Sequence, residues 1–179
     1  METTDEIIHY FRAIPHCAAL LDEPGVRIRE GGPRGGLNPL MDVTLRQNEG
    51  LIKKMYFDQR DYFPNGDIRP RGCEFLQLGP GVIGQPGIAH GGFQSTLMDH
   101  LTGTLIGLSG LDEGLGMFTL NLNVSYHKPL FAPAVVIAKA WLDRVEGRKM
   151  YIRASIEDLQ GDICTTADAL FIKKRAEKA

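Results

Sequence analysis

One helix-length segment followed directly by four strand-like segments constrains the fold more than any other feature of this chain. Residues 91–108 carry large apolar side chains at helical spacing along one face, namely Phe93, Leu97, Leu101, Leu105 and Leu108. The pattern then changes to the alternation or apolar runs typical of strands, at residues 118–126, 134–145, 150–159 and 163–173. Short turns separate these segments. Four strands joined this tightly predict an antiparallel meander.

The first half of the chain adds two strands and a helical arm. Strands are predicted at residues 51–57 and 73–78. Residues 3–21 have helical spacing, and Pro15 within them predicts a kink or two short helices. Glycine and proline then accumulate over residues 22–39, which predicts a linker. We therefore expect a helical arm and glycine-rich linker over residues 1–39. An α+β domain should follow over residues 40–175, with one long helix across a curved antiparallel sheet of about five to six strands.

Charge and composition narrow the classes of function. The formal net charge is −2 and the pI is about 6.2, so the chain has no basic excess for binding nucleic-acid phosphates. No apolar run is long enough to span a membrane, and the acidic N-terminus lacks the features of a signal peptide. Cys17, Cys73 and Cys164 follow no metal-binding or disulfide pattern. We expect a cytoplasmic protein without a metal site, a nucleic-acid partner or a membrane span.

The segment His90-Gly91-Gly92 lies where a glycine-rich loop meets the predicted helix. Two glycines at such a junction let a ligand approach the backbone closely. The first amides of a helix have no partner within it. Together with the positive end of the helix dipole, they form an anion site or an oxyanion hole for an acyl carbonyl. A helix that merely begins after a glycine turn explains the same residues equally well.

Asp99 adds a carboxylate two turns into this helix. It shares a stripe of small and polar side chains with Gly92, Ser95 and Thr96, roughly opposite the apolar face. A carboxylate there is either exposed on a solvated face or held in a cleft. Because a helix that crosses a sheet has little free solvated face, we expect a cleft. A carboxylate in a cleft serves as a general base for water or as a nucleophile.

Three motifs in order resemble those of the hotdog-fold acyl-CoA thioesterases. The first is His-Gly-Gly with an aspartate nine residues after the histidine. The others are Thr-Leu-Asn-Leu-Asn-Val-Ser-Tyr-His-Lys-Pro at 119–129 and Leu-Asp-Arg-Val-Glu-Gly-Arg-Lys at 142–149. The chain is similar to the PaaI-type group, and especially to the branch of thioesterase superfamily members 4 and 5. The similarity spans about residues 73–173 and implies a hotdog fold, in which the sheet wraps the central helix.

The resemblance also implies roles for individual residues. Asp99 would be the base or nucleophile, and the amides near Gly92 and Phe93 would polarise the thioester carbonyl. His90 would shape the loop, and Thr119 would reach the site from a second subunit, because active sites of this fold lie at dimer interfaces. Further substrate contacts are expected from Gly91, Asn121, Arg144, Arg148 and Lys149. The implied partners are a second copy of the chain, in a homodimer or a dimer of dimers, and coenzyme A as part of the substrate, with no separate cofactor.

Three functions remain open at this stage. The first is a hydrolase that cleaves an acyl-CoA or acyl-carrier thioester to free acid and thiol. The second is a non-hydrolytic hotdog enzyme of a biosynthetic pathway, such as a dehydratase or cyclisation helper, although the acid and histidine pair of dehydratases is not evident. The third is a binding protein without turnover. Asp99 and Thr119 favour the hydrolase.

Overall fold

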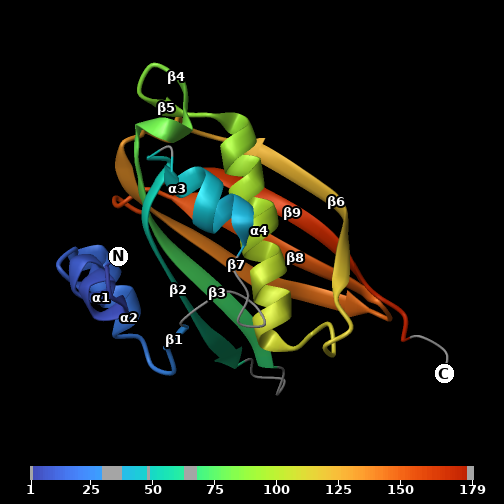
Figure 1. Ribbon diagram of the computed structural model, residues 1–179. Helices are drawn as coiled ribbons and strands as arrows, with labels where there is room; N and C mark the ends of the chain where they lie inside the picture. The colour runs from blue at the N-terminus through green and yellow to red at the C-terminus, as the bar shows by residue number, and fades with distance from the viewer. Residues whose placement is uncertain (1, 30–37, 48, 63–67, 177–179) are drawn as a thin grey trace.

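Seven antiparallel strands form the main sheet, in the order β1-β2-β3-β7-β8-β9-β6. The computed structural model describes residues 2–29, 38–47, 49–62 and 68–176 (Figure 1). The strands are β1 (Arg27–Arg29), β2 (Leu51–Tyr62), β3 (Ile68–Leu78), β6 (Met117–Tyr126), β7 (Ala134–Glu146), β8 (Lys149–Glu157) and β9 (Ile163–Lys173). A second, two-stranded sheet pairs β4 (Ile83–Gln85) with β5 (Ile88–Ala89). The α+β class and all six predicted strands are confirmed.

The predicted helix over residues 91–108 is α4 (Gly91–Ser109), which crosses one face of the sheet (Figure 1). Leu97, Leu101 and Leu105 from its apolar face are buried in the main core, together with side chains from β3, β7, β8 and β9. The helix ends at Gly110, whose φ of 76° lies in the left-handed region that favours glycine. The helical spacing of the sequence therefore predicted both the element and its buried side.

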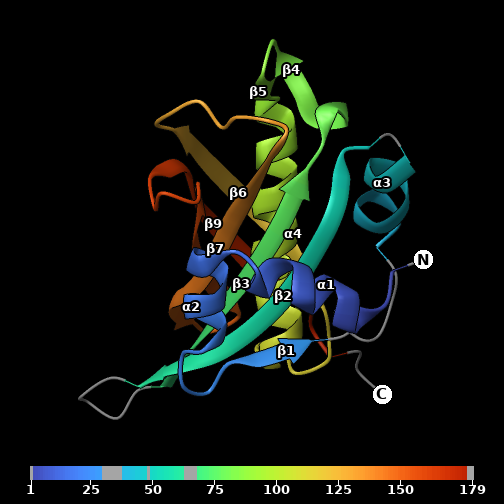
Figure 2. The same cartoon turned by 90° about the vertical axis from the view of Figure 1, so that its left-hand side faces the viewer.

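The N-terminal arm consists of two short helices on the opposite face of the sheet (Figure 2). Helix α1 (Thr4–Arg12) begins with a capping box, and α2 (Pro15–Leu21) begins at the proline that was expected to divide the segment. Phe11 and Cys17 pack against Phe57 and Phe75 in a second hydrophobic cluster. The arm therefore covers apolar side chains that the sheet turns away from α4.

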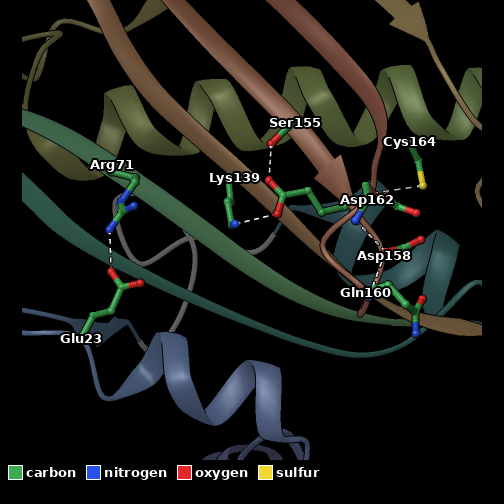
Figure 3. A network of polar contacts seen from close by, with 9 residues as sticks. Glu23, Arg71, Lys139, Ser155, Asp158, Gln160, Asp162 and Cys164 are labelled. Atoms are coloured by element: carbon green, nitrogen blue, oxygen red, sulfur yellow. Dashed lines mark hydrogen bonds and ion pairs between the residues drawn. The ribbon is translucent and has the colours of Figure 1, made fainter.

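Polar contacts also lie on the face of the sheet that the N-terminal arm covers (Figure 3). Glu23, just beyond α2, accepts hydrogen bonds from Arg71 at 2.7 Å and from Gln59 at 2.9 Å. Lys139 of β7 binds Glu157 of β8 at 2.6 Å. The charged side chains on this face are therefore paired with one another. The pair of Glu23 and Arg71 joins the end of the arm to β3, and the pair of Lys139 and Glu157 joins β7 to β8.

Two sequence predictions about topology are wrong. Residues Arg27–Arg29 were assigned to the linker, but they form β1 and pair with β2, which raises the sheet to seven strands. The carboxylate of Asp58 adds to this pairing, because it binds Arg29 at 2.5 Å and Arg27 at 3.2 Å. Residues 30–37, which hold most of the linker glycines, lie outside the described residues.

The predicted four-strand meander holds for β7, β8 and β9 but not for β6. Strand β6 pairs with β9 at the edge of the sheet, instead of with β7, which follows it in sequence. The connection over residues 127–133 is too long for a tight hairpin and contains Pro129 and Pro133. Its residue Leu130 is buried and accepts a hydrogen bond from the Ala89 N–H at 2.8 Å. This loop therefore crosses the end of the sheet next to the start of α4.

Candidate active site

The first turn of α4 is fixed by contacts from both of its neighbours. His90 is its N-cap, and the ring Nδ1 accepts the Gly92 N–H at 2.9 Å. Tyr126 of β6 donates to the Gly91 carbonyl at 2.9 Å and contacts the Ser95 hydroxyl at 2.7 Å. The His90 cap and the Tyr126 side chain therefore hold the start of the helix. Because His90 Nδ1 accepts a hydrogen bond, the neutral ring has its proton on Nε2.

The amides at this helix start are not equivalent. The Gly92 N–H is taken by His90, and the Gln94 N–H donates to the His90 carbonyl at 3.1 Å. For the Phe93 N–H, no acceptor exists within the described part of the chain. Of the two amides expected to polarise a carbonyl, the Phe93 amide is therefore available, and the Gly92 amide is engaged by the cap.

Asp99 and Thr119 meet on the flank of α4 that lies beside the edge strand β6. The Thr119 hydroxyl donates to Asp99 Oδ1 at 2.9 Å, and both side chains are exposed. The resemblance implied that Thr119 would come from a second subunit, but the structure pairs it with Asp99 of its own chain. A cleft was expected around Asp99, and in the single chain its side chain is exposed beside β6.

A β-bulge in β6 turns Thr119 toward α4. The register of β6 with β9 shifts between Thr119 and Asn121, so Leu120 has no partner. Thr119 lies opposite the buried Phe171, whereas Asn121 lies opposite Leu170 on the other face. Strict alternation had placed Thr119 and Asn121 on one face. That prediction is wrong, because an inserted residue reverses the facing of the residues before it.

The expected contacts outside α4 and Thr119 are not brought to this site. Arg144 pairs with Tyr151 of β8, and Lys149 pairs with Ile172 of β9. This register places both on the face of the sheet opposite α4, as it does Asn121. Arg144 binds Asp143 at 2.8 Å and Glu146 at 2.7 Å, contacts that raise the pKa of its guanidinium. Arg148 donates to the Lys173 carbonyl at 2.8 Å.

A hollow of about 460 Å³ opens beside the start of α4. Its lining includes His90, Tyr126, His127 and Lys128. The hydrogen bond with Asp162 at 2.8 Å raises the pKa of Lys128. The sequence analysis selected His90 but not Tyr126, His127 or Lys128, and of these three only Tyr126 falls within the alternation of residues 118–126.

That alternation correctly placed Tyr126 on one face with Leu122 and Val124, and this face covers the helix. Among the described residues, no three His, Cys, Asp or Glu side chains gather as metal ligands do, and none of the described helices has the length and apolarity of a membrane span.

Comparison with known proteins identifies the family. A sequence model described as the thioesterase superfamily matches residues 86–165, which hold the start of α4, Asp99 and Thr119. Acyl-coenzyme A thioesterase THEM4 of Mus musculus is 37% identical over 112 residues, which cover 62% of this chain and 46% of THEM4. Verlamelin biosynthesis protein B of Lecanicillium sp is 30% identical over 170 residues, which cover 78% of this chain and 74% of that protein.

The chain belongs to the thioesterase superfamily. The crystal structure of the BH2602 protein from Bacillus halodurans with CoA matches this superfamily member with a TM-score of 0.56, at 19% identity over 99% of this chain and 97% of that one. This similarity confirms the hotdog fold. The chain spans about half the length of THEM4.

Proposed function

We propose that this protein hydrolyses an acyl-CoA or acyl-carrier thioester to a free acid and a thiol, with coenzyme A present only as part of the substrate. The observation that carries the proposal is the hydrogen bond between Thr119 and Asp99, two exposed side chains on the flank of α4 beside β6. The available Phe93 amide at the positive end of the same helix supports it. So do the similarity to THEM4, a protein named as an acyl-coenzyme A thioesterase, and to BH2602, whose structure contains CoA.

In the proposed reaction, Asp99 is the general base. Thr119 occupies Oδ1, which orients the carboxylate and leaves Oδ2 to accept a proton from water. The water oxygen bonds to the thioester carbon, and the Phe93 N–H donates to the oxyanion that forms. Collapse of this intermediate breaks the carbon–sulfur bond, and the thiolate receives the proton from Asp99. Atoms and charges balance without a metal or redox partner.

We also propose that the working form is a homodimer. Phe93 and Asp99 are six residues apart, which is about 9 Å along a helix axis. If two chains pack with their α4 helices antiparallel, along the exposed flanks that carry Asp99, the Phe93 amide of one chain lies opposite Asp99 of the other. Support comes from Phe118 and Leu120 on the edge strand β6, which are 59% and 52% exposed, because folded proteins cover apolar edges of this kind.

The dimer proposal has a direct test. Light scattering at micromolar concentration should give twice the chain mass. Mixing chains that carry Asp99→Asn with chains that carry Gly92→Val should restore part of the activity, because one of the two sites in each heterodimer is then intact. Differently tagged chains that co-purify without recovery would show that each chain carries its own site, and a monomer would overturn the dimer itself.

Carrier-bound thioesters are the second candidate substrate. The match to a protein named for verlamelin biosynthesis, which covers 78% of this chain, favours a substrate from a biosynthetic pathway. Free-thiol release should be compared between matched acyl-CoA and acyl-phosphopantetheinyl-carrier substrates, and no release from either would refute the hydrolase. We further propose a cytoplasmic location, supported by three buried cysteines with free thiols.

A further inference from the structure

Two backbone carbonyls in the first turn of α4 accept hydrogen bonds from side-chain hydroxyls. The Thr96 hydroxyl donates to the Gly92 carbonyl at 2.9 Å. The Gly91 carbonyl accepts the hydroxyls of Ser95 at 3.2 Å and of Tyr126 at 2.9 Å. Three hydroxyls therefore converge on two adjacent peptide groups, at the end of the helix where we propose that the thioester carbonyl binds.

The Gly92 carbonyl and the Phe93 N–H belong to the same peptide group. Because the C–N bond of a peptide has partial double-bond character, a donor on its oxygen draws electrons away from its nitrogen. The N–H then becomes a stronger donor, as in any chain of hydrogen bonds that polarise one another. The Phe93 N–H has no acceptor within the described part of the chain. Thr96 therefore acts, through one peptide group, on the amide proposed to stabilise the oxyanion.

The other two hydroxyls act on a different peptide group. Their acceptor, the Gly91 carbonyl, shares its peptide group with the Gly92 N–H, and this N–H donates to His90 Nδ1 at 2.9 Å. Polarisation of that group strengthens the cap of the helix and leaves no donor for a substrate. Of the three hydroxyls, the Thr96 hydroxyl is thus the one whose peptide group has an available amide.

A second threonine of α4 makes the same kind of contact without an available amide. Threonine in a helix often bonds to the carbonyl four residues earlier, and the Thr102 hydroxyl donates in this way to the Met98 carbonyl at 2.8 Å. The amide of that peptide group is the Asp99 N–H, which lies in the interior of the helix, where backbone N–H groups have helical partners. Thr96 and Thr102 therefore form a matched pair that differs in what the polarised amide can reach.

We infer that Thr96 is a positioning residue for the proposed hydrolysis, which orients and strengthens the Phe93 amide as a donor to the oxyanion. The inference rests on the proposed thioesterase function and adds a residue to its machinery. One oxyanion donor contributes about 10²–10³-fold to kcat. A neighbouring hydrogen bond strengthens such a donor by about 10–30%. Loss of the Thr96 hydroxyl should therefore lower kcat about two- to eightfold.

The test compares hydroxyl deletions at the two threonines. Thr96→Val keeps the β-branched shape and a similar helix propensity, and it should lower kcat for an acyl-CoA by this factor. Affinity for the matching S-alkyl-CoA, a thioether that has no carbonyl and is not cleaved, should stay unchanged, because the hydroxyl acts on the carbonyl alone. Thr96→Ser should restore the rate. Thr102→Val is the matched control and should leave kcat at the wild-type value.

A second measurement does not depend on turnover. An S-(2-oxoalkyl)-CoA carries a ketone in place of the thioester carbonyl and is not cleaved. A donor to the ketone oxygen lowers its carbonyl stretching frequency, so the infrared band of the bound ketone should lie at a lower frequency in the wild type than in Thr96→Val. Thr102→Val should give the wild-type frequency.

The outcomes separate the role of Thr96 from the hydrolase itself. An undiminished kcat in folded Thr96→Val, an equal loss in Thr102→Val, or a Thr96→Ser variant as slow as Thr96→Val would overturn the inference. Thr96→Ala, which favours the helix, tests the same hydroxyl should Thr96→Val fail to fold. A ketone band that depends on Thr96, in a protein that releases no thiol from acyl-CoA, would keep the role of Thr96 and refute the hydrolase.

Discussion

Removing the Thr119 hydroxyl should slow thioester hydrolysis about tenfold without unfolding the protein. Thr119→Val keeps the shape of the side chain and deletes the donor that lies 2.9 Å from Asp99 Oδ1. Hydrogen bonds to charged groups contribute about 1.5–3 kcal/mol. Because both side chains are exposed and screened by water, we take about 1.4 kcal/mol, which is about tenfold in rate. An exposed substitution of this kind should change the free energy of unfolding by less than about 0.5 kcal/mol.

The assay is initial-rate release of free thiol from an acyl-CoA, with urea denaturation as the stability control. Thr119→Ser restores a donor and should recover most of the rate. In an Asp99→Asn background, Thr119→Val should have little further effect, because the hydroxyl then has no carboxylate to orient. An undiminished rate in folded Thr119→Val would refute this reasoning, as would an equal loss in both backgrounds.

Three further predictions follow from other contacts. A Cβ on Gly92 would lie 3.0 Å from His90 Nδ1, so Gly92→Val should displace the cap and lower kcat at least tenfold with little change in thermal midpoint; unchanged kcat would contradict the role of this turn. Burial raises the pKa of the Cys17 thiol from 9.0 to about 11. Its stabilising contribution is therefore complete below pH 9 and is lost as the pH rises through about 11, so the unfolding free energy of the wild type should fall relative to Cys17→Ala over that range. Thr165→Val removes the hydroxyl that donates to the buried side-chain Oε1 of Gln94. It should lower the free energy of unfolding, measured by urea denaturation, by about 1–3 kcal/mol; an unchanged value would mean that another donor replaces the hydroxyl.

The sequence predicted the elements far better than their partners. Helical spacing identified the buried side of α4, and Pro15 correctly marked the division of the N-terminal arm. These features depend on neighbours within a few residues. The placement of β6 beside β9 depends on where a seven-residue loop carries the chain, and local pattern does not encode that path.

The site was predictable in part for the same reason. Asp99 and the glycines at the start of α4 follow from local spacing, but the facing of Thr119 depends on a bulge at Leu120 that no alternation of side chains reveals. The hydrogen bond from the Gly92 N–H to His90 Nδ1 is likewise not visible in the sequence, because it depends on the conformation of the turn. Strand β1 was missed because it has only three residues and pairs with residues 56–58 of β2, which are distant in sequence.

The most direct test of the central claim is thiol release by Asp99→Asn. Asparagine keeps the size of the side chain and can still accept the Thr119 hydrogen bond, but it cannot take a proton from water. If Asp99 is the base, kcat/KM for the best acyl-CoA substrate should fall by about 10²-fold or more, while affinity for the matching S-alkyl-CoA and the thermal midpoint stay unchanged. A folded Asp99→Asn protein that binds the thioether and hydrolyses the thioester at the wild-type rate would contradict the account.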